Sequence, residues 1–375
     1  MVMILTTKWL GDKPSVVTIT NPDNGFVKQI FLWKKGLGTK LFDIRDRETF
    51  IKKFVAKCDE IVIIDYKQFV DYFGILDAGK IYDFPSDDGV DLENPGSWLE
   101  SRKDVLAGKW QLIRAKAAIV YNRLEKSGVR IEHQVVYPKY EMTVYSGRSK
   151  VVGAYNIQGM TEEWPIRHVN SSNTLFLHFD WISADMRMGA LISGDTDMLE
   201  SFNLIDPYGV ICEALDGVIP RADVKQEFMK AVYSLSGDSE ILRVYPVFAQ
   251  WINDQAAFLD ANGYTESILG RRYYTDGTRK GKLRAVNAIL QGSVAHAVNN
   301  VLWQVEEKCG DILVTEQHDS IIVAVKQELA QEYIKSISDI MYRPLLGLTD
   351  KDLTMPLKVA VGKSWRKYKH LKDFR

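Results

Sequence analysis

The sequence has few cysteines, no apolar run of membrane-spanning length and almost no net charge. Its three cysteines, Cys58, Cys212 and Cys309, lie far apart without CxxC spacing, which argues against a disulfide framework and a zinc site. The N-terminal stretch MVMILTTKWLGDKP lacks the basic start and the long apolar segment of a signal peptide. These absences predict a soluble cytoplasmic protein with no membrane partner.

A formal net charge of −1 over 375 residues argues against a protein that coats nucleic acid nonspecifically, but the charge is segregated. Residues 270–284 and 361–375 each hold six basic residues against one aspartate, so each carries +5 and the remainder carries −11. Residues 180–240 hold twelve acidic residues against four basic ones. A single charge run is usually a solvated surface. Two basic stretches with interleaved aromatics beside an acidic centre fit a polyanion-binding protein with a metal–carboxylate site better.

The length and composition predict an ordinary globular protein of two or three domains, with 46% hydrophobic and 26% charged residues. Residues 1–104 alternate short apolar runs with turn residues, which favours an α/β region, and they close in the linker-like stretch FPSDDGVDLENPG. Residues 109–127 have apolar positions at helical spacing, and Gly128 follows as a stop signal. Short strands and long helices alternate from there to the end.

Two aspartates lie at the ends of apolar strands. The strand TLFLHF ends at Asp180, where a lone aspartate is most often the cap of the following helix. Residues 311–325 read as strand, tight turn and strand, with Asp319 in the turn, where there is no helix to cap. Together, two such carboxylates would hold a pair of Mg²⁺ or Mn²⁺ ions about 3.5–4 Å apart, which suits phosphoryl transfer. The adjacent His318 is open to two interpretations, a general base or ligand and a packed side chain.

A basic amphipathic helix is predicted over residues 220–237, with Pro220 at its start and Gly237 past its end. Four residues repeat at intervals of four along one face: Arg221, Lys225, Met229 and Tyr233. Two cations one turn apart suit a triphosphate, and the methionine and tyrosine offer a surface for a base and its sugar. Taken alone, such a helix is usually an ordinary surface helix.

These three elements together resemble the polymerase portion of family A DNA polymerases. FDWISADMRMGALISGD is similar to the family's motif A, with Asp180 as a metal-binding aspartate. The 220–237 helix is similar to the nucleotide-binding helix of motif B, and QHDS is similar to motif C, with Asp319 as the second metal ligand. The resemblance therefore implies catalysis with two Mg²⁺ ions, for which Mn²⁺ can substitute, and dNTPs as substrates.

Further segments resemble the family in the same order along the chain, so that the resemblance covers residues 105–375. SGRSKVVGAYNIQ resembles the template-primer-binding TGR…NLQN segment, GYTESILGRRYY the stretch after the fingers, and VNAILQGSVAH a helix that contacts the minor groove. The resemblance implies that primer-template DNA is bound by Arg148, Asn156, Gln158, Arg284, Asn287, Gln291 and His318. Minor-groove acceptors are common to all correct base pairs, so such contacts check shape without reading sequence. The two basic stretches would hold phosphates, with an affinity that falls steeply with salt.

The implied fold is α+β: a right-hand polymerase with an antiparallel palm sheet, helical fingers and a reduced thumb. We expect the thumb at residues 105–145, the palm at 146–200 and 276–375, and the fingers at 201–275. Residues 1–104 would form a small α/β domain, either a degenerate remnant of a 3′–5′ exonuclease or an unrelated replacement.

Two parts of the family pattern are reduced. Only VYPKY and its neighbours separate RLEKSGVRIE from SGRS, where the family has a long helical thumb. We therefore expect low processivity unless a partner protein supplies a clamp. The first apolar strands lack the carboxylate pair that a proofreading exonuclease needs, so we expect no proofreading. By analogy, the missing parts indicate a phage or other mobile replicon, with replication and repair both open as pathways.

Other departures concern the nucleotide sugar. Asp185 stands where typical members have the glutamate that helps to exclude a ribose 2′-hydroxyl, Met229 where they have an aromatic residue, and Ser320 where they have a glutamate. The last two also occur in phage-type single-subunit RNA polymerases. Tyr208 stands where many relatives have a phosphate-contacting histidine, so that contact is in doubt.

Three functions remain open from the sequence. The preferred one is a template-directed DNA polymerase, because Asp185 retains a carboxylate and the SGRS…NIQ and VNAILQGS segments look like those of the DNA enzymes. The first alternative is an RNA-synthesising or mixed dNTP/rNTP enzyme resembling a primase. The second is a non-catalytic DNA-binding component of a replisome, against which the retained metal carboxylates argue.

Overall fold

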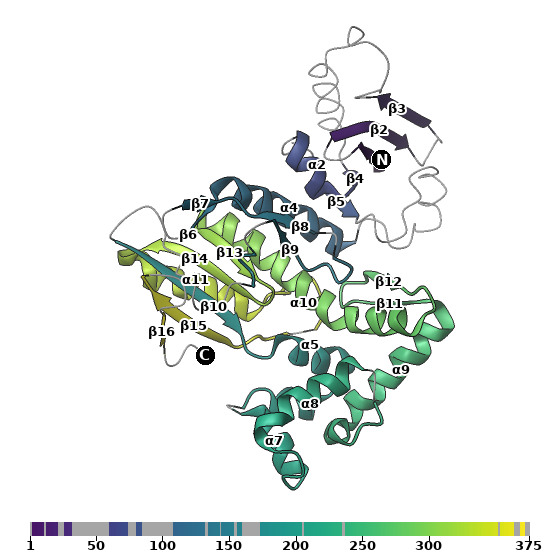
Figure 1. Ribbon diagram of the computed structural model, residues 1–375, viewed down its shortest axis with the longest axis vertical. Coiled ribbons are helices and arrows are strands. Elements are labelled where there is room, and N and C mark those ends of the chain that lie inside the picture. The colour runs from purple at the N-terminus through teal and green to yellow at the C-terminus, as the bar shows by residue number, and fades with distance from the viewer. Residues whose placement is uncertain are drawn as a thin grey trace. The chain divides into compact units, whose positions relative to one another are not determined.

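The computed structural model describes residues 2–10, 13–21, 26–31, 60–73, 80–84, 108–131, 134–142, 144–153, 156–159, 173–204, 206–234, 237–351, 353–363 and 368–371. The chain forms two compact units (Figure 1). Unit 1 comprises residues 1–128, 136–144 and 149–156, and unit 2 comprises residues 129–135, 145–148 and 157–375. The predicted linker and the predicted domain boundary after residue 104 lie outside the described residues.

Unit 1 is built on a mixed five-stranded sheet in the order β3-β2-β1-β4-β5. Its strands are β1 (Val2–Leu10), β2 (Lys13–Asn21), β3 (Phe26–Phe31), β4 (Glu60–Ile64) and β5 (Lys80–Phe84). Strands β1 and β3 each pair antiparallel with β2, whereas β4 is parallel to both β1 and β5. Parallel strands need a crossover connection, so this part of the chain has the α/β character that its apolar runs predicted.

Two helices of unit 1, α2 (Tyr66–Phe73) and α4 (Lys109–Ser127), pack on each other, and α4 also packs on β5. The helix predicted at residues 109–127 is confirmed, and it ends at Gly128, whose positive φ of 68° favours glycine. A buried ion pair between Arg114 and Asp83, 2.9 Å apart, joins α4 to β5. The short strands β8 (Lys139–Glu141) and β9 (Lys150–Val152) pair with each other.

Unit 2 contains an antiparallel sheet in the order β13-β14-β10-β15-β16, called the central sheet below (Figure 1). Its strands are β10 (Thr174–Trp181), β13 (Leu313–Gln317), β14 (Ser320–Lys326), β15 (Leu357–Gly362) and β16 (Tyr368–Leu371). The β13–β14 hairpin predicted over residues 311–325 is confirmed and lies beside β10.

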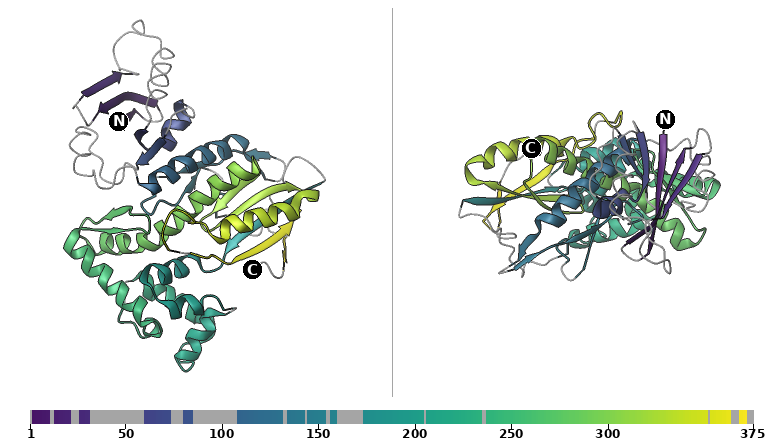
Figure 2. Two further views of the ribbon diagram at one scale, coloured as in Figure 1. Left: turned by 180° about the vertical axis from the view of Figure 1, so that it is seen from behind. Right: turned by 90° about the horizontal axis from the view of Figure 1, so that it is seen from above.

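One face of the central sheet is covered by α11 (Ala330–Tyr342), as the view from behind shows (Figure 2). Because side chains alternate along a strand, Leu177, Phe179 and Trp181 of β10 all point to this covered face and are buried. The indole N–H of Trp181 donates to the carbonyl of Met341 in α11 at 2.9 Å. His178 and Asp180 therefore face the opposite side of the sheet, where they are only half-buried.

The rest of unit 2 is mostly helical. Its helices are α5 (Ala184–Ser193), α6 (Thr196–Ser201), α7 (Pro207–Ala214), α8 (Arg221–Tyr233), α9 (Pro246–Asn262) and α10 (Arg279–Cys309), with 3₁₀ turns at Glu240–Val244 and Gln327–Leu329. Its remaining strands are short: β6 (Val129–Ile131), β7 (Gln134–Val136), β11 (Tyr264–Glu266) and β12 (Arg272–Tyr274). Of the helices in the described ranges, none has the length and apolarity to cross a membrane.

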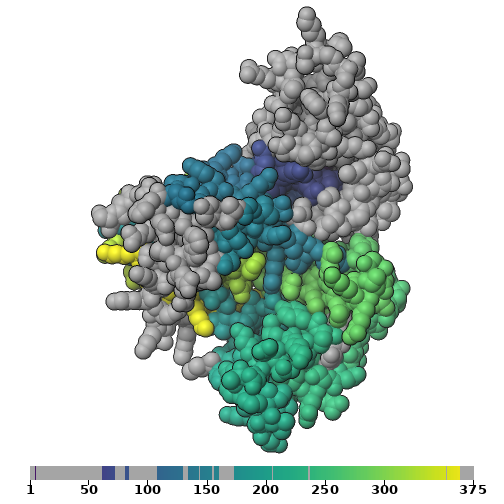
Figure 3. All heavy atoms as spheres, viewed as in Figure 1, coloured from purple at the N-terminus to yellow at the C-terminus, as the bar shows by residue number. Residues whose placement is uncertain are grey.

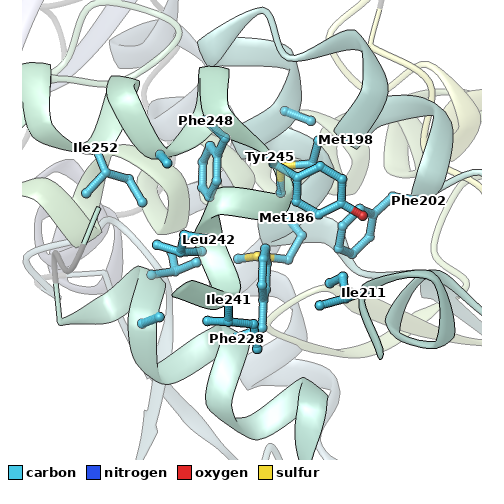
Figure 4. Packing of buried hydrophobic residues seen from close by; sticks show 14 of the residues in the cluster. Met186, Met198, Phe202, Ile211, Phe228, Ile241, Leu242, Tyr245, Phe248 and Ile252 are labelled. Carbon is cyan, nitrogen blue, oxygen red and sulfur yellow. The ribbon is translucent and has the colours of Figure 1, made fainter. Parts of the chain in front are cut away.

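Helices α5 to α9 share one apolar core, and their side chains form a continuous surface in the space-filling view (Figures 3 and 4). Phe202, Phe228 and Tyr245 meet at its centre, with ring centroids 6.0–6.3 Å apart. The predicted helix at 220–237 forms as α8, which starts after Pro220 but already ends at Tyr233. Its buried face consists of Val224, Phe228, Ala231 and Val232. The mixture of helices and an antiparallel sheet confirms the predicted α+β class.

Candidate active site

A cavity of about 430 Å³ opens at the C-terminal end of β10. Its walls come from the β10–α5 connection, the β13–β14 turn, the start of α7, the exposed face of α8 and the start of β15. Six residues that the sequence predicted as catalytic or nucleotide-binding line it: Asp180, Asp185, Arg221, Lys225, Met229 and Asp319. The fold thus gathers residues from three separate motifs into one space.

Asp180 and Asp319 are brought together by strand pairing. Asp180 is the register partner of Ser320 at the start of β14, and the amide of Trp181 donates to the carbonyl of Asp319 at 3.3 Å. Burial, with a second contribution from the negative charge of Asp319, raises the pKa of Asp180 to about 6. Burial also raises the pKa of Asp319. The two carboxylates thus lie in a partly dry site that disfavours their negative charges until a cation offsets them.

This pair fits divalent hard cations. Carboxylate oxygens are the ligands that Mg²⁺ prefers, and Mg²⁺ is usually held by one or two carboxylates together with substrate phosphates. Within the part of the chain that the structure describes, no group of three or more His, Cys, Asp or Glu side chains has metal-binding geometry. Among the described residues, the two aspartates are therefore the donors that would hold such an ion.

Hydrogen bonds to the Glu316 carboxylate stabilise the turn that carries Asp319. His318 adopts a left-handed conformation with φ of 62°, and its amide donates to the buried carboxylate of Glu316 at 2.7 Å. The side-chain amide of Gln158 also donates to Glu316, at 2.5 Å. Gln158, which the sequence predicted to touch DNA, thus helps to hold the β13–β14 turn in this structure. Burial, with a contribution from the Arg148 charge, lowers the pKa of the His318 ring.

The exposed face of α8 presents its two cations to the cavity. Arg221 forms a solvent-exposed ion pair with Asp206, the residue that caps α7. Arg221 and Lys225 both lie over the ring of Tyr208, with their charged groups 5.6 and 5.8 Å from its centroid. Tyr208 is itself buried against the aromatic core of the helices. The Tyr208 ring therefore stabilises the two cations through cation–π interactions.

Asp185, at the start of α5, is the centre of a hydrogen-bonded network. Its carboxylate accepts from the Arg148 guanidinium at 2.9 Å and from the Tyr233 hydroxyl at 2.5 Å. The side-chain amide of Asn287 donates to the carbonyl of Tyr233 at 2.9 Å, and Gln291 forms a hydrogen bond with the Tyr233 side chain. Burial, with a further contribution from Asp185, raises the pKa of Tyr233, which keeps its hydroxyl protonated as a donor. Two predicted DNA-binding residues thus position the tyrosine of α8.

The segment before Arg148 needs glycine. Gly147 has φ of 84°, and a Cβ there would lie 2.6 Å from the guanidinium of the buried Arg271. A side chain at Gly292 of α10 would meet the hydroxyl of Tyr273 and the carbonyl of Ser146. The backbone of the SGRS segment therefore approaches its neighbours more closely than any other residue type allows.

The remaining predicted DNA-binding residues are placed as follows. Arg284 is exposed near the start of α10, and its guanidinium lies 3.8 Å from the ring centroid of Tyr145. Asn156 is exposed in unit 1, whereas the other predicted contacts belong to unit 2.

Sequence reasoning missed three residues: Asp206, Glu316 and Lys358. Asp206 had a usable signal, since an Asp-Pro pair before an apolar run is typical of a capped helix start. Lys358 lines the cavity from β15, and only its pairing with Asp180 reveals its place.

Comparisons with known proteins agree with this geometry. Residues 239–367 match the family model described as DNA polymerase family A. The fold is similar to a solved structure described as the POL domain of Pol1 from M. smegmatis in complex with DNA primer-template and dNTP, with a TM-score of 0.67 and 14% sequence identity. That similarity covers 98% of this chain and 96% of the other. The search of curated proteins found no match.

The raised pKa of Asp180 predicts a stability change that can be measured without catalysis. A carboxyl whose pKa rises on folding from 3.8 to about 6 favours folding below about pH 4, and this contribution is lost as the pH rises through 6. Asp180→Asn should therefore raise the free energy of unfolding by about 1–2 kcal/mol at pH 7.5, with a smaller difference toward pH 4. Urea unfolding at both pH values measures the effect.

The exposed Asp339 of α11 provides the matched control, Asp339→Asn, which should unfold like the parent. Mg²⁺ should raise the Tm of the parent and of this control more than that of Asp180→Asn, because a ligand of the folded state stabilises it. Equal unfolding of all three proteins at pH 7.5, with equal responses to Mg²⁺, would contradict the prediction that Asp180 is a half-buried metal ligand.

Proposed function

We propose that this chain is a family A DNA polymerase that extends a primer 3′ end with dNTPs on a DNA template by two-metal phosphoryl transfer; the matched residues 239–367 and the similar fold support this. The observation that carries the proposal is the meeting of Asp180 and Asp319 beside the cationic face of α8 in one cavity. The similar solved structure holds a primer-template and a dNTP, and the same substrates suit this cavity.

In this proposal, each part of the site has one task. Asp180 and Asp319 hold the Mg²⁺ ions; when bound, these supply Lewis-acid stabilisation to the attacking and leaving oxygens. Lys225 and Arg221 bind the triphosphate through charge-assisted hydrogen bonds. Met229 and Tyr233 lie further along the same face, where the base and sugar would rest. Catalysis then depends on positioning and electrostatics, as is general for phosphoryl transfer.

The DNA would be held by two kinds of contact. Arg148, Asn287 and Gln291 surround the Asp185–Tyr233 pair and would meet the minor groove next to the primer end. Arg284 and the rest of the 270–284 stretch would hold backbone phosphates, so binding should weaken steeply with salt. His318 and Asn156 complete the proposed DNA contacts.

A mixed dNTP/rNTP polymerase is the second candidate, and the geometry of Asp185 bears on it. This side chain is one methylene shorter than the glutamate of typical relatives. It is nevertheless held by Arg148 and Tyr233, so a carboxylate still stands at the start of α5 in the wall of the cavity. We propose that this fixed carboxylate helps to exclude the 2′-hydroxyl and keeps dNTPs as the preferred substrates.

Primer extension tests the function directly. With a labelled primer on a DNA template and Mg²⁺, the parent should extend with dNTPs and much less with rNTPs. Asp180→Ala and Asp319→Ala should each lower the rate roughly a thousandfold or more, because each removes a ligand of the catalytic ions. The control Asp339→Ala should match the parent. Comparable extension with both pools would favour the mixed enzyme, and no extension by the parent, even with replication partners added, would favour a non-catalytic component.

Sugar selection should depend on the Tyr233 hydroxyl. Tyr233→Phe removes one of the two side chains that hold the Asp185 carboxylate, so the carboxylate gains freedom to move away from the sugar. The ratio of kcat/KM for a dNTP to that for its rNTP should fall about tenfold. Tyr333→Phe, in α11, should leave the ratio unchanged. An unaltered ratio in Tyr233→Phe would show that Asp185 does not act through this hydrogen bond.

We propose that the enzyme lacks proofreading. Strands β1, β2 and β3 carry no aspartate or glutamate, and the carboxylate of Asp83 on β5 is engaged by Arg114 and by the amide of Tyr66. A primer with a mismatched 3′ end should therefore stay intact in the presence of Mg²⁺ without dNTPs. Shortening of that primer, retained in Asp180→Ala, would reveal an exonuclease.

We also propose low intrinsic processivity. Between the end of α4 and Arg148, the described residues form only the short strands β6, β7 and β8, where relatives carry a helical thumb. A trap for dissociated enzyme should therefore shorten the products strongly, unless a separate partner protein supplies a clamp.

A further inference from the structure

Lys358 of β15 lies on the same side of the central sheet as Asp180. On β15 its neighbours Leu357 and Val359 are buried, whereas Lys358 is exposed. It is the direct register partner of Asp180 on the adjacent strand. Directly opposed residues of an antiparallel pair point to the same face, so Lys358 projects on the side of the sheet that carries the catalytic aspartates. It lines the same 430 Å³ cavity.

Most of the other charges around the cavity are already matched by partners. Arg221 pairs with Asp206, and Asp185 pairs with Arg148. Across the described ranges, neither Lys225 nor Lys358 has a side-chain hydrogen bond or an ion pair. Two carboxylates, Asp180 and Asp319, and two ammonium groups therefore remain to meet the substrate. The two carboxylates suit divalent cations, and the two ammonium groups suit a polyanion.

The two ammonium groups come from different walls. Lys225 belongs to α8 and Lys358 belongs to β15 of the central sheet, with Asp180 on the adjacent strand β10 and Asp319 on the β13–β14 turn beyond it. An ammonium on a four-carbon stem is a mobile point charge with three donors, which suits phosphate oxygens. Divalent cations bound at Asp180 would offset the carboxylate that otherwise attracts Lys358. The lysine is then available to a phosphate group.

We propose that Lys358 binds a phosphate oxygen of the incoming nucleoside triphosphate, and of the pyrophosphate product, from the β15 side of the cavity. The inference rests on the proposed function, since it assigns a further contact to the substrate of that site. Lys358 would thus be a nucleotide-binding residue on the central sheet, separate from the cationic face of α8.

Nucleotide binding without turnover tests this proposal. The full chain is loaded with a primer-template whose primer ends in a dideoxynucleotide, and the matching dNTP is titrated in the presence of Ca²⁺. Lys358→Gln should raise the Kd of the dNTP about five- to twentyfold, because a charged donor to phosphate is lost. Lys358→Arg should stay within about threefold of the parent. The affinity for inorganic pyrophosphate, titrated as a competitor, should fall in parallel in Lys358→Gln.

Lys326→Gln is the matched control, because Lys326 is an exposed lysine at the far end of β14 and does not line the cavity. It should bind dNTP like the parent, and thermal unfolding should show all three variants folded. Unchanged dNTP and pyrophosphate binding in Lys358→Gln would overturn the proposal. A weaker affinity for primer-template, with unchanged dNTP binding, would overturn it in favour of a DNA-backbone contact.

The same titration separates this inference from the proposed function. Suppose that the parent binds dNTP, that Lys358→Gln weakens this binding, and that the parent extends no primer. This result would support the phosphate contact and overturn the proposed polymerase activity. A parent that binds no dNTP would overturn both.

Discussion

The antiparallel register of β10 is the constraint on which the site depends. Pairing with β14 sets Asp180 against Ser320, next to Asp319, and pairing with β15 sets it against Lys358. Side chains alternate along a strand, so a slip of one residue would turn Asp180 toward α11 and bring Phe179 to the cavity. The burial of Leu177, Phe179 and Trp181 against α11 resists that slip. The apolar half of the strand thus fixes the position of the Asp180 carboxylate.

The cationic face of α8 is placed by the opposite face of the same helix. Phe228 is fully buried among Phe202 and Tyr245, which fixes the rotation of α8 about its axis and leaves Arg221 and Lys225 directed at the cavity. Tyr233 at the end of the helix then reaches Asp185 of α5. A hydrogen bond between partly buried groups is stronger than one in water, so this contact joins α8 firmly to α5.

Sequence reasoning succeeded where the signal is local. Glycine after α4, proline before α8 and two apolar runs around a polar turn are short-range features, and they predicted those elements and the central strand pairing. Sequence reasoning failed where two polar side chains far apart in the sequence form a hydrogen bond. Gln158 lies 158 residues from Glu316, and both are compatible with many other partners, so nothing in either segment indicates their hydrogen bond. Lys358 was missed for the same reason: its role follows from a strand register, which hydrophobic alternation in PLKVAV alone does not determine.

The two arginine pairs at the site differ in burial, and this difference separates their tasks. The side chains of Arg221 and Asp206 are 45% and 50% exposed, so water can replace either partner and the pair can open at little cost. The side chains of Arg148 and Asp185 are 22% and 16% exposed, and Asp185 also holds Tyr233. Breaking that pair would leave a partly buried charge without a partner, which is costly. Arg221 is therefore suited to exchange its carboxylate for another anion, whereas Arg148 is suited to keep Asp185 in place.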